Sequence, residues 1–168
     1  EEATSDLAAH AARSAMRRAG ISPDEVDRLI LGTVSPDYMS PSAACITQKL
    51  LLLRPVPAFD VTASCSGFLY ALDLAARALV TGDDCVVVIA ADVRSRFLDH
   101  SDRGTCALFG DGAGAAVLTQ GPIGTGLIGI GLLADGSGAH SVYVPAGGSR
   151  EPASEATVAR KRHTIQMA

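Results

Sequence analysis

The chain has 168 residues, which is long enough for one domain with a substantial core. Its composition is that of a globular protein, with 48% hydrophobic residues and a formal net charge of −4. The acidic balance argues against nucleic acid as a partner. No apolar run is long enough to cross a bilayer, so we expect neither a membrane partner nor a signal peptide.

The cysteines argue for free thiols. None of the four, Cys45, Cys65, Cys85 and Cys106, belongs to a CxxC pair, which argues against a zinc site. Three of them lie inside apolar runs, where small buried side chains are common. We therefore expect a reduced, cytoplasmic protein without a bound metal.

A helix opens the chain. Apolar residues recur at helical spacing from Leu7 to Ala19, with Thr4 or Ser5 as the expected cap and Gly20 as the expected end. The next residues, Ser22 to Glu25, are typical of a capping box with proline at the first helical position, and they predict one short turn.

Strands and helices then alternate. A buried strand is predicted over Leu29 to Val34, and a second helix from Ser40-Pro41 to about Leu53. The continuous apolar run Cys85 to Ala91 is typical of a parallel strand covered on both faces. This alternation predicts an α/β fold built in layers.

A cysteine lies between a strand and a helix in the middle of the chain. The apolar run that starts at Pro57 ends in small residues around Cys65, and a helix with little polar surface is predicted over Ser66 to Thr81. Such a helix is expected to be buried. At its N-terminus, free N–H groups and the helix dipole favour a thiolate. Cys65 is therefore a candidate nucleophile, and the alternative is a small buried cysteine.

The last third of the chain changes character. Short strands punctuated by glycine are predicted up to Val144, and Ser154 is expected to cap a final helix that ends in the basic cluster Arg160 to His163. The sequence Gly124 to Gly129 matches the dinucleotide fingerprint. We interpret it as a false match, because strand-like residues follow where a helix is required.

Two further polar groups receive weaker interpretations. The residues Asp99, His100 and Asp102 have side chains of the types that bind metals, but we interpret them as part of a solvated loop. No histidine stands out as the base for Cys65, and His140 in its glycine-rich loop is the least unsuitable.

Five long motifs stand in order along the chain: Pro41 to Cys45, Ala58 to Phe68, Asp102 to Thr105, Phe109 to Ala115, and Ala134 to Gly138. They resemble those of the ketoacyl-ACP synthase III branch of the thiolase-fold condensing enzymes, and the resemblance runs over essentially the whole chain. The resemblance implies a thiolase-like layered α/β/α fold, comprising mostly the N-terminal half of that fold and the glycine-rich strands that follow it.

The resemblance also implies an activity. Cys65 would take an acyl group from acyl-CoA as a thioester, and malonyl-acyl carrier protein would then decarboxylate and attack it, without a cofactor. Arg103 matches an arginine at the adenine end of coenzyme A, with a loop salt bridge to Asp99 or Asp102 as its alternative role. Phe109 begins the glycine-rich turn beside the active site. Ser40 matches an acyl-pocket residue supplied across the interface of a homodimer.

The chain departs from the family pattern in what it lacks. The family's catalytic histidine and asparagine belong to a C-terminal half that these residues do not match, and its first strand and a tryptophan would precede Glu1. We therefore expect residues 1–168 to be a partial thiolase-like domain from a longer enzyme in fatty acid or polyketide initiation.

Two alternatives remain open. One is an acyltransferase of the same fold that does not condense, and the other is a non-catalytic partner subunit. The retained Cys65 argues against the partner subunit, which would not need the thiol.

Overall fold

The computed structural model describes residues 2–167 and divides the chain into two compact units. Unit 1 comprises Glu1–Asp92 and Gly112–Leu132, and unit 2 comprises Val93–Asp111 and Leu133–Ala168. Unit 1 contains a four-stranded sheet and the three longest helices, whereas unit 2 contains short helices and a two-stranded ribbon.

Helix α1 spans Thr4–Ala19, and the predicted capping role of Thr4 or Ser5 was wrong. Both residues lie in the first turn and are buried. The Thr4 hydroxyl donates to the Ser35 carbonyl at 2.5 Å, while the backbone N–H and hydroxyl of Ser5 donate to the Asp37 carboxylate at 2.9 and 2.6 Å. These hydroxyls face the loop after the first strand and fix it to α1.

The next turn follows the sequence prediction. Gly20 ends α1 with a φ of 70°, a conformation that glycine adopts at little cost. A 3₁₀ turn then spans Pro23–Glu25, and the backbone N–H and hydroxyl of Ser22 donate to the Glu25 carboxylate at 2.8 and 2.7 Å.

The sheet of unit 1 has the strand order β2-β1-β3-β4. Its strands are β1 (Arg28–Gly32), β2 (Ala58–Val61), β3 (Cys85–Val93) and β4 (Asp111–Thr119). Strand β1 runs parallel to both of its neighbours, β2 and β3. The sequence prediction placed the end of β1 at Val34, two residues too late, because Thr33 and Val34 leave the sheet and bond to Asp92.

Helix α2 spans Ala43–Leu50, which is shorter at both ends than predicted. Its cap is Ser42 and not Ser40, since the Ser42 hydroxyl accepts the Cys45 N–H at 3.4 Å. The helix ends before Leu52, whose φ of 58° is incompatible with a continuing right-handed helix.

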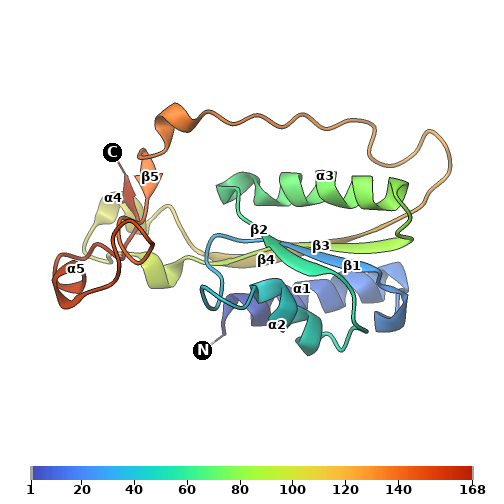
Figure 1. Cartoon of the computed structure of the whole chain (residues 1–168), viewed down its shortest axis with the longest axis horizontal. Coiled ribbons are helices and arrows are strands. Elements are labelled where there is room, and N and C mark those ends of the chain that lie inside the picture. Colours follow the sequence, from blue (N-terminus) through green and yellow to red (C-terminus); the bar gives the residue numbers. More distant parts are fainter. Residues whose placement is uncertain (1, 168) are drawn as a thin grey trace. The chain divides into compact units, whose positions relative to one another are not determined.

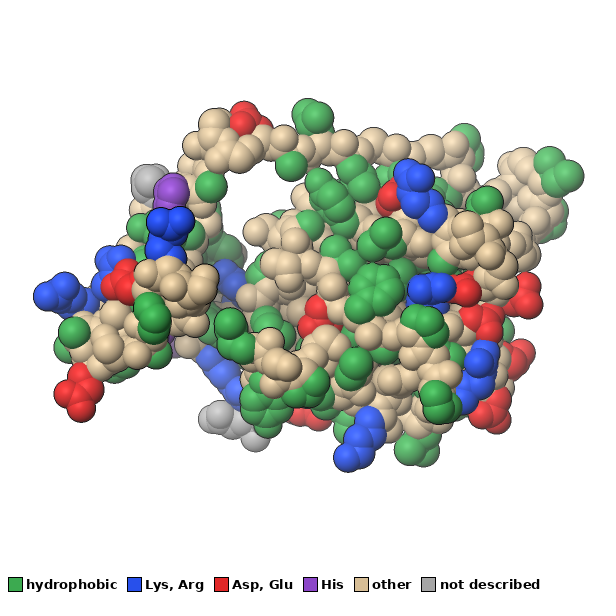
Figure 2. Space-filling model, in the orientation of Figure 1, with side chains coloured by type: hydrophobic (Ala, Val, Ile, Leu, Met, Phe, Trp, Pro, Cys, Tyr) green, Lys and Arg blue, Asp and Glu red, His purple; other side chains and the backbone are tan. Residues whose placement is uncertain are grey.

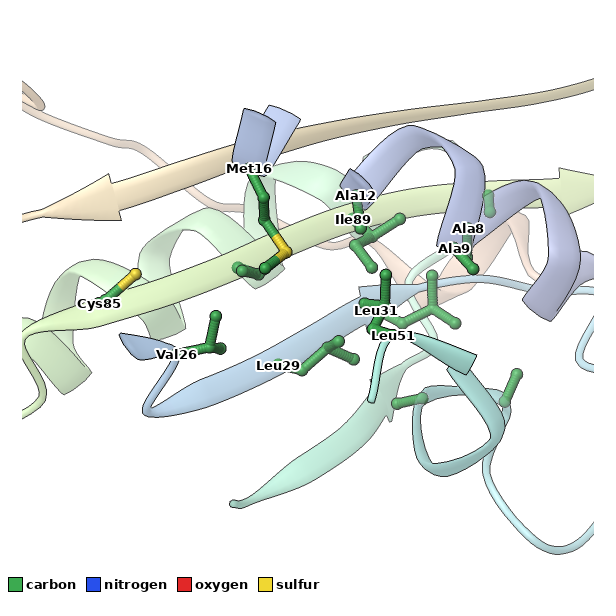
Figure 3. Packing of buried hydrophobic residues seen from close by; sticks show 14 residues of the cluster. Ala8, Ala9, Ala12, Met16, Val26, Leu29, Leu31, Leu51, Cys85 and Ile89 are labelled. Carbon is green, nitrogen blue, oxygen red and sulfur yellow. The ribbon is translucent and has the colours of Figure 1, made fainter. Parts of the chain in front are cut away.

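Unit 1 is layered, with α1 and α2 on one face of the sheet and α3 (Gly67–Val80) on the other (Figure 1). Leu29 and Leu31 of β1 pack with Ile89 of β3 beneath α1 and α2 (Figure 3). The intervening Ile30 faces α3 together with Val88. Side chains thus alternate between two fully buried faces, as the apolar runs predicted.

Helix α3 is less buried than its sequence predicted. Its small residues Gly67, Ala71, Ala75 and Ala78 face the sheet, and they are its only buried positions. The outer face is apolar but exposed, with 47% of Leu69 and 87% of Val80 accessible, and hydrophobic side chains lie at the surface here (Figure 2). The prediction failed because residues 2–167 pack against one face of α3 and leave much of the other exposed.

Unit 2 is built from short elements. They are two 3₁₀ turns, Ser95–Phe97 and Gly136–Gly138, helices α4 (Arg103–Cys106) and α5 (Glu155–Ala159), and antiparallel strands β5 (Val142–Tyr143) and β6 (Gln166–Met167). Ser154 caps α5 as predicted, accepting the Thr157 N–H at 3.2 Å, but the helix ends before the basic cluster.

The predicted strands between Thr119 and Val142 were wrong. Residues 120–141 contain no strand, and Ile123, Ile128 and Leu133 are exposed there. Strands need a hydrogen-bonded neighbour, and this segment has none in the described part of the chain. No helix follows Gly129, where a pyrophosphate would require one.

Among residues 2–167, no helix is long and apolar enough to cross a membrane. The same residues hold no cluster of histidine, cysteine or carboxylate side chains suited to a metal ion. Asp99, which was considered for such a cluster, pairs instead with Lys161 at 2.7 Å.

Candidate active site at Cys65

Cys65 lies where the sequence predicted it, between a strand and a helix. A 3₁₀ turn over Ser64–Ser66 joins β2 to α3, and Cys65 is its central residue. The thiol is exposed. Ser64 has a φ of 47°, which is uncommon for a residue other than glycine and costs free energy unless its surroundings hold it. The turn therefore presents the sulfur at the start of α3.

Two glycines allow the turn to lie against the sheet. A Cβ atom built on Gly32, at the end of β1, would lie 2.8 Å from the Gly67 carbonyl carbon and 3.1 Å from the Phe68 nitrogen. These separations are shorter than van der Waals contact, so the first turn of α3 approaches β1 at a distance that only glycine permits. This contact fixes the height of the helix start, and hence of Cys65, above the sheet.

The other three cysteines differ from Cys65 in their surroundings. Burial raises the pKa of the Cys85 thiol, with smaller contributions from the carboxylates of Asp27 and Glu25, so this thiol is inert. Cys45 is exposed, but its sulfur accepts the Ser42 hydroxyl at 3.1 Å and donates to the Ala58 carbonyl at 3.5 Å. Cys106 is half-buried. Cys65 is therefore the thiol best placed to attack a substrate.

Asp60, on β2, ties the start of α2 to the strand that leads to Cys65. Its two carboxylate oxygens accept the N–H groups of Ala43 and Ala44, at 2.8 and 2.7 Å. These are unpaired donors at the N-terminus of α2, where a negative charge is also favoured by the helix dipole. The start of α2, and with it the loop that contains Ser40, is thereby anchored to β2.

Ser40 is exposed in the loop before α2, next to the exposed Tyr38 and Met39. Both Ser40 and Cys65 belong to unit 1, on segments that Asp60 connects. The sequence assigned Asp60 no role. The sequence nevertheless indicated that Asp60 has a structural role, because a carboxylate within a half-buried apolar strand needs a hydrogen-bonding or charged partner.

Arg103 is the first residue of α4 and is exposed. The salt bridge considered as its alternative role does not form, because Asp99 pairs with Lys161 and Asp102 accepts the Gly104 N–H at 2.9 Å as the helix cap. Within residues 2–167, Arg103 has no carboxylate partner. Its guanidinium group is therefore available to a ligand.

Phe109 is half-buried in unit 2, ahead of the glycine-rich strand β4. The Arg94 guanidinium lies 5.8 Å from the centre of its ring and 5.8 Å from the ring of Phe97, distances suited to cation–π attraction. Beside it, hydrogen bonds from the Ser95 hydroxyl and N–H hold the pKa of the Asp111 carboxyl below its usual range.

The residues predicted for the site are divided between the units. Cys65 and Ser40 belong to unit 1, and Arg103 and Phe109 belong to unit 2. His140, the least unsuitable base in the sequence, belongs to unit 2 and packs edge-to-face on Tyr143 at 5.3 Å between ring centres.

Comparison with known families extends these observations. The family model of the thiolase N-terminal domain matches residues 1–92, and that of 3-oxoacyl-[acyl-carrier-protein] synthase III matches residues 59–136. Cys65 lies within both matches.

Individual relatives agree with the family models. The chain is 49% identical to the beta-ketoacyl-[acyl-carrier-protein] synthase III of Syntrophomonas wolfei over 99% of its own length and 51% of that protein. A crystal structure of 3-oxoacyl-(acyl-carrier-protein) synthase III superposes with a TM-score of 0.89 at 35% identity, covering 99% of this chain and 53% of that one. A priming beta-ketosynthase from the R1128 polyketide pathway gives 0.81 at 29% identity, covering 99% and 49%.

The chain thus spans about half the length of the relatives that it matches. The layered α/β architecture inferred from the alternating elements is confirmed by these superpositions. The chain belongs to the thiolase family, in its 3-oxoacyl-[acyl-carrier-protein] synthase III branch.

Proposed function

We propose that the protein carrying this chain is a β-ketoacyl-acyl carrier protein synthase III, and that Cys65 is its nucleophile. The observation that carries the proposal is the exposed Cys65 thiol at the start of α3. Relatives with 40–49% identity over nearly the whole chain are named for this activity, which adds support.

The reaction has two stages. In the first, the Cys65 thiolate attacks the carbonyl carbon of an acyl-CoA, the new carbon–sulfur bond forms, and coenzyme A leaves with its sulfur. In the second, malonyl-acyl carrier protein loses carbon dioxide, and the resulting carbanion attacks the Cys65 thioester. A carbon–carbon bond forms, the Cys65 sulfur is released, and the β-ketoacyl product stays on the carrier. The thiol carries the acyl group itself, so no resident cofactor is required.

The helix start would assist the first stage. Attack on a thioester builds negative charge on the carbonyl oxygen, and positioned N–H donors stabilise such a charge strongly. The Cys65 N–H at the entry to α3 is one such donor. Decarboxylation in the second stage needs donors of its own, which we assign to a histidine and an asparagine outside these residues.

The other site residues would bind substrate. We assign Arg103 to the adenine end of coenzyme A, Phe109 to the wall beside the acyl group, and Ser40 to the acyl pocket. A serine at position 40 leaves volume that a bulky side chain would fill, which suits longer or branched primers.

The pathway and assembly are also part of the proposal. Initiation of fatty acid synthesis fits the names of the relatives, and the priming ketosynthase of a polyketide pathway supports polyketide initiation as the second candidate. We infer a homodimer, with residues 1–168 forming part of each thiolase-like domain. Use of acyl-CoA and of a free thiol fits the cytoplasm.

Acylation of Cys65 is the direct test. In the full-length protein, incubation with a short acyl-CoA is expected to add one acyl mass to the peptide containing Cys65, and Cys65→Ser should abolish this, because a hydroxyl at that position is a far weaker nucleophile. The measurement is mass spectrometry of the intact and digested protein. Cys45→Ser is the matched control, since it also removes an exposed thiol, and it should leave acylation intact. Acyl groups found on Cys45 instead of Cys65 would contradict the assignment.

Removal of Arg103 should weaken substrate binding without affecting the chemical step. Arg103→Ala is expected to raise KM for acyl-CoA about tenfold and to leave kcat nearly unchanged, because the guanidinium contacts the carrier and not the reacting carbon. Steady-state kinetics with varied acyl-CoA measures both constants. Arg18→Ala, which removes an exposed arginine at the end of α1, controls for net charge. A fall in kcat at constant KM would assign Arg103 to the chemistry.

A further inference from the structure

Three chain segments leave the sheet together at its carboxyl edge. Gly32, the last residue of β1, lies opposite Val61 of β2 and Ala90 of β3. Because these strands are parallel, the residues that follow them emerge at the same edge. One of these segments is the Cys65 turn, another is the loop that begins at Thr33, and the third is the end of β3 at Asp92.

A single carboxylate oxygen accepts three hydrogen bonds from the loop after β1. Oδ1 of Asp92 accepts the Thr33 hydroxyl at 3.1 Å, the Val34 N–H at 2.9 Å and the Ser35 hydroxyl at 2.8 Å. The Thr33 and Ser35 side chains are both buried, so neither hydroxyl can turn to water without the loop moving. A carboxylate is a stronger acceptor than a neutral group, and Asp92 thereby fixes three consecutive residues.

The same loop holds the segment that leads to Cys65. The Thr33 N–H donates to the Val61 carbonyl at 3.1 Å, and the Thr62 hydroxyl donates to the Thr33 carbonyl at 3.4 Å. One residue earlier, Gly32 lies directly against Gly67. The loop bound by Asp92 therefore contacts the chain before the turn, and Gly32, the residue that leads into this loop, contacts the first residue of α3.

The turn itself requires such support. The positive φ of Ser64 is a conformation that persists only where neighbouring structure determines it. Thr62, which the loop contacts, and Gly67, which Gly32 contacts, lie two and three residues from Ser64. Displacement of the loop would leave the turn free to relax, and the Cys65 sulfur would move with it.

We propose that Asp92 is a positioning residue that holds the Cys65 turn in the geometry needed for acyl transfer. The inference rests on the proposed function for its kinetic consequence, but its structural part is independent of the substrate. Asp92 acts through Thr33 and Gly32 and not on the reacting atoms. Since a nucleophile displaced by about 1 Å can lose on the order of 10²-fold in rate, the expected effect is large.

The chain offers a matched control at the opposite end of the same strands. Asp27, just before β1, is half-buried like Asp92, and its carboxylate accepts the N–H groups of Asp84 and Cys85 at 2.8 and 2.9 Å and pairs with Arg54. It therefore ties β1 to β3 at their amino ends, as Asp92 does at their carboxyl ends. Removal of either carboxylate should lower thermal stability, but only Asp92 binds the loop that contacts the segment leading to Cys65.

The experiment compares Asp92→Ala, Asp92→Asn and Asp27→Ala in the full-length protein. For single-turnover acylation by acyl-CoA, Asp92→Ala should lower the maximal rate about 10²-fold with little change in the half-saturating concentration. Asp92→Asn, which keeps an acceptor oxygen, should recover at least a tenth of the wild-type rate. Asp27→Ala should acylate within about threefold of wild type. Equal rates for Asp92→Ala and Asp27→Ala would overturn the proposal.

A second readout needs no substrate. Amide hydrogen exchange in the peptide spanning residues 62–68 should be faster in both Asp92 variants than in wild type, and unchanged in Asp27→Ala. If wild-type protein is not acylated, the proposed function is wrong, and the exchange of this peptide still decides whether Asp92 positions the turn. Unchanged exchange in Asp92→Asn would reject the positioning role even where Asp92→Ala does not fold.

Discussion

Replacement of Gly32 with valine is expected to destabilise the protein by about 3 kcal/mol and to abolish acylation of Cys65. The added Cβ alone would lie 2.8 Å from the backbone of Gly67, and the two methyl groups of valine would extend further into the first turn of α3. Backbone cannot rotate away as a side chain can, so β1 or the helix must move. Valine favours strands, and intrinsic propensity by itself would predict the opposite effect.

A graded series separates the close contact from other causes. Gly32→Ala should already cost about 2 kcal/mol, because its Cβ would lie 2.8 Å from backbone that must shift, and Gly32→Val should cost about 3 kcal/mol. Thermal melts of the full-length variants measure the series, and Tm should fall in the order wild type, alanine, valine. A valine variant as stable and as readily acylated as wild type would show that Gly67 does not limit the space at Gly32.

The polypeptide made of residues 1–168 alone is expected to associate or to fold poorly, and not to condense acyl-CoA with malonyl-acyl carrier protein. The exposed apolar face of α3 is the reason for the first expectation, since Leu69, Leu74 and Val80 are 47%, 40% and 87% exposed there. Apolar surface left in water forgoes about 25 cal/mol per Å², which is a serious loss against a typical stability of about 5–15 kcal/mol. The second expectation rests on the proposed function, which assigns decarboxylation to a histidine and an asparagine outside these residues.

The test measures size, melting and decarboxylation together. Sedimentation and a thermal melt should show associated protein without a cooperative transition, and malonyl-carrier decarboxylation should equal the background rate. Full-length protein, prepared in parallel, is the control for the assay. A soluble monomer that melts cooperatively and forms the β-ketoacyl product would contradict the prediction.

Much of unit 1 could be predicted because its signals are local. The apolar runs gave β1 and β3, glycine and the capping box gave the end of α1 and the next turn, and the strand–turn–helix context placed Cys65. The failures are tertiary. Thr4 and Ser5 have the composition of helix caps, but their hydroxyls bond to Ser35 and Asp37 more than 30 residues away, a contact that no local pattern reveals.

The candidate site shows the same limit. The nucleophile is recognisable from its neighbours in sequence, whereas Asp60 and Asp92 act on residues brought close only by the parallel pairing of strands. Asp92 had a usable signal, since it directly follows the apolar run Cys85 to Ala91, which predicted a buried parallel strand. The predicted burial of α3 failed for another reason. Helical periodicity indicates that an apolar face favours burial, but it does not identify the part of the protein that packs against it.

The bonds from Asp60 to the start of α2 have a consequence for the order of folding. Helix α2 has eight residues, too few to be stable by itself, because nucleation is costly and each end leaves donors or acceptors unpaired. Two of those donors find their acceptor only on β2, which must first pair with β1. We therefore expect the loop bearing Ser40 to acquire its shape late, after the strand leading to Cys65 is in place.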